Sequence, residues 1–219
     1  MSGARRSPVA ASIVLGAATG VFGASFGVLA VASGLSVAKT GALSLLVFTG
    51  ASQFAAVGVI GSGGTPLAAL GSALLLAARN SAYGVVLAPV VRGPWWQRLV
   101  AAHLVLDEST AMAMAQADPR DRVRAFWATG VAVFVCWNIG TLAGALGGGV
   151  IGDPSTLGLD AAFPAGFVVL IAPHLRRLDG RVAAALGAGI ALVLVPLAPP
   201  GVPVIAAGLA ALVGLRARP

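Results

Sequence analysis

Residues 66–91 read PLAALGSALLLAARNSAYGVVLAPVV, an apolar run that carries a single charged residue, Arg79. A helix rises about 1.5 Å per residue, so this run is longer than the roughly 20 residues that cross the hydrocarbon core of a bilayer. The stretch is therefore predicted to be a helix whose solvent is a membrane.

The rest of the sequence repeats this pattern on both sides. Of the 219 residues, 58% are apolar and 10% are charged, whereas a soluble domain carries about a quarter of charged residues. With a mean hydropathy of +0.95, the chain is predicted to be one integral membrane domain over residues 1–219, an all-α bundle of transmembrane helices. Seven or eight membrane segments are expected, some broken or re-entrant, at about Val9–Gly34, Thr40–Ile60, Pro66–Val91, Leu99–Ala117, Ala125–Ile151, Asp160–Leu175, Val182–Leu197 and Val202–Leu215.

The positions of the arginines predict an orientation in the membrane. The net charge is +7, but the arginines cluster at chain ends and in short loops, without the aromatic-interleaved basic face of a nucleic-acid site. Loops on the cytoplasmic side are enriched in Lys and Arg, so the clusters in residues 120–124, 176–181 and 216–218 are expected on one side. If eight segments cross, Arg92 and Arg98 fall on the other side; a re-entrant fourth segment or a broken first segment removes this conflict.

Glycine is abundant in the first segment, where residues 16–27 read GAATGVFGASFG. Small residues four apart let two helix backbones approach closely in lipid, which is one interpretation of this run. The other is local unwinding, because irregular backbone is tolerated in a membrane where it lines a protected cavity. On that interpretation, Gly23 and Gly27 line a path for a solute.

Arg79 is the clearest candidate for a functional residue. A charged side chain at membrane depth costs roughly 2.5–3.5 kcal/mol, so it requires a partner or a role. Tyr83 lies four residues further on, and the two side chains share one face of the predicted helix. We expect both to face a solute path, with a purely structural ion pair as the alternative.

The natural partners of Arg79 are Asp107 and Glu108, two adjacent acids in an otherwise apolar segment that also contains His103. On a continuous helix, His103 and Asp107 share a face, whereas Glu108 points about 100° away. One acid is expected to neutralise Arg79 and the other to titrate, so we assign proton coupling to these three residues. The alternative is an amphipathic surface helix whose acids are solvated.

Two further groups place polar atoms at membrane depth. Gly50, Ser52 and Gln53 lie within the second segment and are expected either to bond to a neighbouring helix or to meet a polar solute. Asp160 is suited to cap the sixth helix, and Pro164 frees a backbone carbonyl near its start, so both are candidates for a solute path. A simple N-cap is the alternative for Asp160.

The common enzyme motifs are missing. Residues 35–40 approach a phosphate-binding loop, but Ala38 replaces the required glycine and no strand precedes it. No Cys/His spacing typical of a metal site is present, and the single cysteine, Cys136, lies in an apolar helix. We therefore expect no enzyme activity, no metal and no cofactor.

Five blocks of the sequence carry a family resemblance. They are Phe26-Gly27-Val28-Leu29-Ala30, Phe48-Thr49-Gly50-Ala51-Ser52-Gln53-Phe54, Arg79 with Tyr83-Gly84, Asp107-Glu108-Ser109, and Leu157-Gly158-Leu159-Asp160-Ala161-Ala162-Phe163-Pro164-Ala165. In these blocks, the sequence resembles the AzlC-type branched-chain amino acid permeases. The resemblance covers about residues 9–181, and the combination of the second and last blocks is its most specific part.

The resemblance implies a multi-pass protein of the bacterial cytoplasmic membrane that exports leucine, isoleucine or valine, and sometimes methionine. It also implies a small membrane subunit of the AzlD type as partner. The acids at membrane depth favour proton-driven secondary transport. The alternative is a structural or scaffold subunit in which the pairing of Arg79 with an acid only holds helices together.

Overall fold

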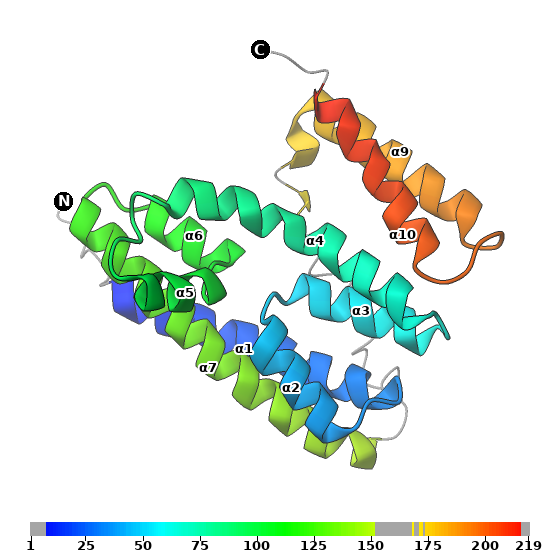
Figure 1. The fold of residues 1–219 in the computed structure, drawn as a ribbon, viewed down its shortest axis with the longest axis horizontal. Coiled ribbons are helices and arrows are strands. Elements are labelled where there is room, and N and C mark those ends of the chain that lie inside the picture. The colour runs from blue at the N-terminus through cyan, green and yellow to red at the C-terminus, as the bar shows by residue number, and fades with distance from the viewer. Residues whose placement is uncertain (1–7, 152–167, 169–170, 173, 216–219) are drawn as a thin grey trace.

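The computed structural model describes residues 8–151, 168, 171–172 and 174–215, and in these residues it contains helices and no strand (Figure 1). The all-α prediction is confirmed for this part of the chain. The helices are α1 (Pro8–Ala32), α2 (Val37–Val47), α3 (Ala51–Gly61), α4 (Pro66–Leu87), α5 (Trp95–His103), α6 (Asp107–Met114), α7 (Pro119–Ile151), α9 (Leu178–Leu194) and α10 (Val202–Ala207), with the 3-10 turns η2 (His174–Arg176) and η3 (Gly208–Leu215).

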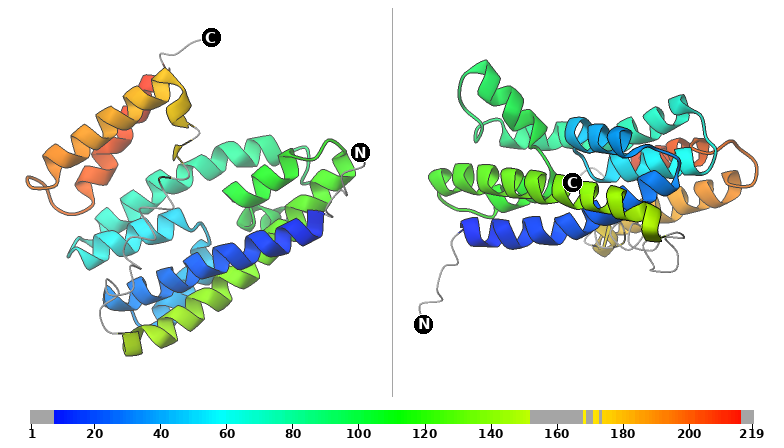
Figure 2. Two further views of the ribbon diagram at one scale, coloured as in Figure 1. Left: turned by 180° about the vertical axis from the view of Figure 1, so that it is seen from behind. Right: turned by 90° about the horizontal axis from the view of Figure 1, so that it is seen from below.

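Three of the described helices, α1, α4 and α7, are long and apolar enough to cross a membrane. Of these, α1 and α7 lie side by side and run in the same direction (Figures 1 and 2). Near the start of α1, the Ser12 hydroxyl is hydrogen-bonded to the hydroxyl of Thr129 in α7 at 2.8 Å. Further along, Gly27 lies against Ala145. Residues later in α1 contact residues later in α7, so the two helices are parallel.

The glycine run in α1 serves this contact. A Cβ atom added to Gly23 would lie 2.5 Å from the carbonyl oxygen of Trp137, and one added to Gly27 would overlap the backbone at Thr141. The helix is continuous from Pro8 to Ala32. The expectation of local unwinding in residues 16–27 is therefore wrong, and the close-packing interpretation holds because α7 occupies this face.

The second predicted segment is instead divided into α2 and α3. The chain turns at residues 48–50, where Gly50 has a φ of +56°, a conformation that favours glycine. The contacts that α2 and α3 make with α7 and α1 show that the two helices form a hairpin. Going along α2, Ser44 bonds Asn138 of α7 at 2.8 Å and Phe48 then contacts the earlier residue Phe134, so α2 runs antiparallel to α7.

The following helix, α3, returns in the opposite direction. Phe54 contacts Phe26 of α1 at a ring distance of 5.5 Å, and Gly61 reaches Ser33 just beyond the end of α1. Hence α3 runs parallel to α1, and both ends of the α2–α3 hairpin lie at the end of the bundle where α1 finishes. In a membrane such a hairpin enters and leaves on one side, so the single span predicted over Thr40–Ile60 is wrong.

The fourth predicted segment is also a hairpin, formed by α5 and α6, and it comes from the opposite end. Leu104 lies against Gly130 of α7. Beyond the end of α6, the Arg122 Nε atom donates to the carbonyl oxygen of Gln116 at 2.8 Å. These contacts make α6 antiparallel to α7. The hairpin therefore starts and ends where α4 finishes and α7 begins, as the re-entrant alternative predicted.

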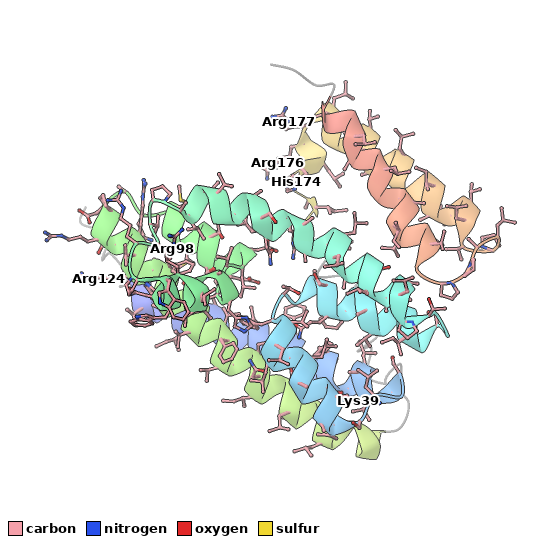
Figure 3. The ribbon with its side chains drawn as sticks, in the orientation of Figure 1. Lys39, Arg98, Arg124, His174, Arg176 and Arg177 are labelled. Atoms are coloured by element: carbon pink, nitrogen blue, oxygen red, sulfur yellow. The ribbon has the colours of Figure 1, made fainter. Side chains whose placement is uncertain are left out.

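This arrangement removes the conflict in the positions of the arginines. Arg92 follows the end of α4, and Arg98 lies in α5. Both are therefore at the end of the bundle that carries Arg124 near the start of α7. Lys39, in α2, lies at the opposite end, as Figure 3 shows. The positive-inside rule therefore predicts that the arginine-rich end faces the cytoplasm.

The C-terminal helices pack beside α4 (Figure 1). Ile205 of α10 contacts Gly71, and Gly208 at the start of η3 contacts Leu75. The helical segment formed by α10 and η3 therefore runs parallel to α4. Gly187 of α9 approaches Ala207, and the two helices form an antiparallel pair. They correspond to the last two predicted segments. Most of the sixth predicted segment, Asp160–Leu175, lies outside the described residues, so the predicted number of seven or eight segments remains a prediction.

Candidate functional site

The tips of the two hairpins meet halfway along the bundle. The His103 Nε2 atom, at the end of α5, lies 2.9 Å from the carbonyl oxygen of Leu45 in α2. The ring of Phe48 lies 5.7 Å from that of His103 and 5.0 Å from that of Phe134. Because the chain turns between α5 and α6, His103 and Asp107 are on different helices, and the expectation that they share one helix face is wrong.

The ion pair expected from the sequence is present at this level. The Arg79 Nη2 atom lies 3.0 Å from Asp107 Oδ2, and their side chains are 33% and 19% exposed. Arg79 is in the middle of α4, and Asp107 is the first residue of α6. The pairing of Arg79 with one acid is thus confirmed, and it joins a long helix to the tip of a hairpin.

Tyr83 and Glu108 complete a cluster around this pair. Tyr83 interacts electrostatically with Arg79, Asp107 and Glu108, and its hydroxyl lies next to the Asp107 carboxylate. Glu108 in turn interacts with both Asp107 and Arg79. One turn of α4 therefore directs Arg79 and Tyr83 towards the two acids, as the spacing of four residues predicted.

The tip of the first hairpin is closed by Gln53, whose side chain is fully buried. The backbone N–H of Gly50 donates to Gln53 Oε1 at 3.1 Å, and Gln53 Nε2 donates to the carbonyl oxygen of Leu43 at 2.9 Å. The amide thus binds both arms of the hairpin. This is the bonding role that the sequence left open for Gln53.

The tip of the second hairpin is closed in the same way by Ser109. The N–H of Leu106 donates to Ser109 Oγ at 3.0 Å, and the hydroxyl donates to the carbonyl oxygen of Leu104 at 2.7 Å. The sequence predicted no role for Ser109. The signal in the sequence was a serine three residues after the end of an apolar run, which is the spacing of a helix start.

Both half-helices that leave these tips, α3 and α6, begin inside the bundle. A helix N-terminus carries a partial positive charge and N–H groups without partners in the helix. The start of α6 lies beside Arg79, because Asp107, its first residue, forms the ion pair. Because α3 packs back along α4 after the tight turn at residues 62–65, its first residue lies within about one turn of Arg79 along the α4 axis.

Several buried polar atoms near these helix starts have no hydrogen-bond partner in the described part of the chain. In α3 and just before it, they are Ser52 Oγ and Thr49 Oγ1. Around the ion pair, they are Arg79 Nε, Asp107 Oδ1 and Thr110 Oγ1. A buried polar group is ordinarily paired, so this concentration distinguishes the region as a candidate site for a polar solute. Thr49 and Thr110 were not predicted.

The other predicted site residues lie elsewhere. Gly23 and Gly27 pack against α7, and Asp160 and Pro164 lie outside the described residues. Among the described residues, no group of three or more His, Cys, Asp or Glu side chains is arranged to hold a metal ion. An apolar hollow of about 450 Å³ on the outside of α5 and α7 is separate from the acid cluster, and it is lined by Leu99, Val100, His103, Leu104, Val131 and Phe134.

Comparisons with known proteins agree that the chain is a membrane protein. A family model described as "AzlC protein" matches residues 14–151. A Helicobacter pylori protein described as an uncharacterized membrane protein is 27% identical over 193 residues, which cover 87% of this chain and 83% of the relative. No solved structure matches. The matched region contains both hairpins and the Arg79–Asp107 ion pair.

Proposed function

Because the chain belongs to the AzlC family, whose members have a role in membrane transport, we propose that it exports branched-chain amino acids across the bacterial cytoplasmic membrane. Leucine, isoleucine and valine are the proposed substrates, with methionine as a further one. The observation that supports this proposal most strongly is the Arg79–Asp107 ion pair, which lies where two hairpins from opposite ends of the bundle meet.

This geometry suits the passage of a zwitterion. Half-helices that begin inside a membrane protein bring partial charges to a site near its middle, as in secondary transporters with broken helices. Here, the starts of α3 and α6 supply positive ends, and Asp107 and Glu108 supply negative groups. An amino acid needs both signs in one site.

We assign the energy source to protons. Asp107 and Glu108 are ionisable groups at the centre of the bundle, and such groups are typical of proton relays in carriers. His103 is placed at the hairpin contact rather than beside the acids, so its proposed contribution is to couple proton occupancy to the position of the α2–α3 tip through the carbonyl oxygen of Leu45.

A small membrane subunit of the AzlD type is proposed as the partner. Glycine-rich faces suit close contact with another helix, but Gly16 and Gly20 of α1 are covered by α7. The partner must therefore use other surfaces. Exposed apolar side chains are plentiful on α4 and α5, including Leu67, Leu74, Val85, Trp95 and Leu99.

A second candidate function is a scaffold subunit without its own transport path. The observation that favours it is the ion pair itself, since Arg79 and Asp107 join α4 to α6 and thereby stabilise the bundle. In that case, the two charges serve only to neutralise each other.

Uptake of radiolabelled leucine into everted membrane vesicles distinguishes these functions. Vesicles are prepared with this chain alone, with the small subunit alone and with both, and an outward-directed proton gradient is imposed. We expect gradient-dependent uptake that requires the chain. Ser62→Ala, which alters an exposed side chain at the end of α3, is the matched control and retains uptake. No uptake by the two-subunit vesicles, with both proteins inserted, rejects export.

A further inference from the structure

The two half-helices that begin inside the bundle differ in charge. The first turn of α6 carries two acids, Asp107 and Glu108, which complement the positive end of the helix. The first turn of α3 carries no acid, since it starts Ala51-Ser52-Gln53. One positive helix end is thus neutralised by its own side chains, and the other is not.

The start of α3 also presents two hydroxyl groups without partners. Ser52 is 1% exposed, and its Oγ atom has no hydrogen-bond partner in the described part of the chain. The same is true of Thr49 Oγ1, in the residue before the Gly50 turn. Gln53 is already engaged on both sides by Gly50 and Leu43. The two hydroxyls are therefore the side-chain donors left at this helix end.

The positive charge in the middle of α4 is already balanced. Arg79 is paired with Asp107 at 3.0 Å, on the α6 side of the cluster. For an anion that enters the bundle, the Arg79 guanidinium is already neutralised by Asp107. The positive N-terminal end of α3 has no acid to neutralise it. Carboxylates bind at helix N-termini because the N–H groups point at them and the helix dipole favours negative charge.

We propose that the N-terminus of α3 holds the α-carboxylate of the transported amino acid, with the Ser52 and Thr49 hydroxyls as additional donors. This inference rests on the proposed function and specifies how its substrate is recognised. It also places the substrate carboxylate away from Arg79, whose guanidinium keeps its bond to Asp107 and holds the tip of α6.

The test compares carboxylate-dependent competition in vesicles that take up radiolabelled leucine. Unlabelled leucine and leucinamide, which lacks the carboxylate, are the competitors. The unmodified protein prefers leucine. Because a hydrogen bond to a charged group contributes about tenfold or more in affinity, Ser52→Ala with Thr49→Val should raise the half-saturating leucine concentration about tenfold or more and leave inhibition by leucinamide unchanged. Ser62→Ala, at the other end of α3, is the control.

A second variant covers the case in which the double substitution prevents folding. Ser52→Asp places a carboxylate of the protein's own at the helix end, which stabilises the helix and competes with the substrate. It is expected to insert normally and to lose leucine uptake. Wild-type leucine affinity in Ser52→Asp, or an unchanged preference for leucine over leucinamide in the double variant, overturns the inference while export stands. Absence of leucine uptake by the unmodified two-subunit vesicles overturns both proposals.

Discussion

Gln53 and Ser109 make the same pair of hydrogen bonds at the tips of two hairpins that come from opposite ends of the bundle. Each accepts from the N–H three residues before it and donates to a carbonyl oxygen of the preceding helix. The segments α2–α3–α4 and α5–α6–α7 thus share one order, a capped hairpin followed by a long helix, and run in opposite directions. In transporters, such inverted pairs flank the substrate site.

Removal of either cap should destabilise the protein. Gln53→Leu leaves the Gly50 N–H without its partner and removes the bond to the Leu43 carbonyl oxygen. Ser109→Ala removes the corresponding bonds to the Leu106 N–H and the Leu104 carbonyl oxygen at the other tip. We expect about 1–3 kcal/mol for each variant, measured as a lower Tm in detergent. The control is Gln116→Leu, which removes only a bond from a side chain just beyond α6 to the carbonyl oxygen of Met112 and should leave the Tm nearly unchanged.

Arg79→Lys should insert normally but lose most of its transport activity. Lysine keeps the charge but lacks the planar guanidinium that Arg79 presents to Asp107. The comparison is leucine uptake at equal protein level. Arg79→Gln combined with Asp107→Asn removes both charges, and we expect stable insertion without transport. If the double variant transports leucine, the pair is only structural.

Asp107→Asn and Glu108→Gln should separate proton coupling from substrate passage. The variant that removes the coupling group is expected to lose gradient-driven uptake and to retain exchange of leucine for leucine, because exchange moves no net proton. Both reactions are measured in the same vesicles at several pH values. Wild-type pH dependence in both variants would exclude a coupling role for these acids.

The α1–α7 contact provides a matched pair of glycines in one helix. A Cβ atom at Gly144 would overlap the backbone of Ala24 in α1, whereas one at Gly147 meets nothing within 4 Å. Gly144→Ala should therefore cost about 1–3 kcal/mol through overpacking. Gly147→Ala should be neutral or stabilise by up to about 1 kcal/mol through helix propensity. Thermal unfolding in detergent compares them, and equal Tm values would contradict the contact.

The direction of the hairpins predicts which residues an impermeant reagent reaches. In a Cys136→Ala background, Lys39→Cys should react with an impermeant maleimide from outside intact cells, whereas Arg98→Cys should react only in everted vesicles. Both positions are exposed and lie at opposite ends of the bundle. Reaction of both from the same side would show that α2 and α3 together cross the membrane, and would contradict the re-entrant α2–α3 hairpin.

The sequence predicted the chemistry of the site better than its backbone. A charged side chain such as Arg79 requires a partner or a role at membrane depth. Its pairing with an acid could therefore be predicted from charge alone. The break at Gly50 was missed because glycine in a membrane helix serves either unwinding or close packing, and local composition is similar for both. Gly27 was assigned to the first role and has the second, which only the position of α7, more than a hundred residues later, determines.

Hydropathy also failed to separate crossing segments from hairpins, since both are apolar over similar lengths. The polar residues at the tips, Gln53 and Ser109, carried that information. Each lies near the middle of an apolar segment, three residues after the point where the backbone turns. The unpartnered hydroxyls of Thr49 and Ser52 had no distinguishing signal, because their state depends on which bonds the folded chain leaves unused.

The pairing of α1 with α7 has a consequence for synthesis of the protein. Ser12 and Thr129 are bonded to each other yet are 117 residues apart in the chain, so α1 emerges from the ribosome long before the helix that covers its small-residue face. The hairpins lie against both helices and therefore cannot reach their final positions until α7 has been inserted. During that interval, the small-residue face of α1 is covered by lipid or by the insertion machinery, and the order of translation determines when the bundle can close.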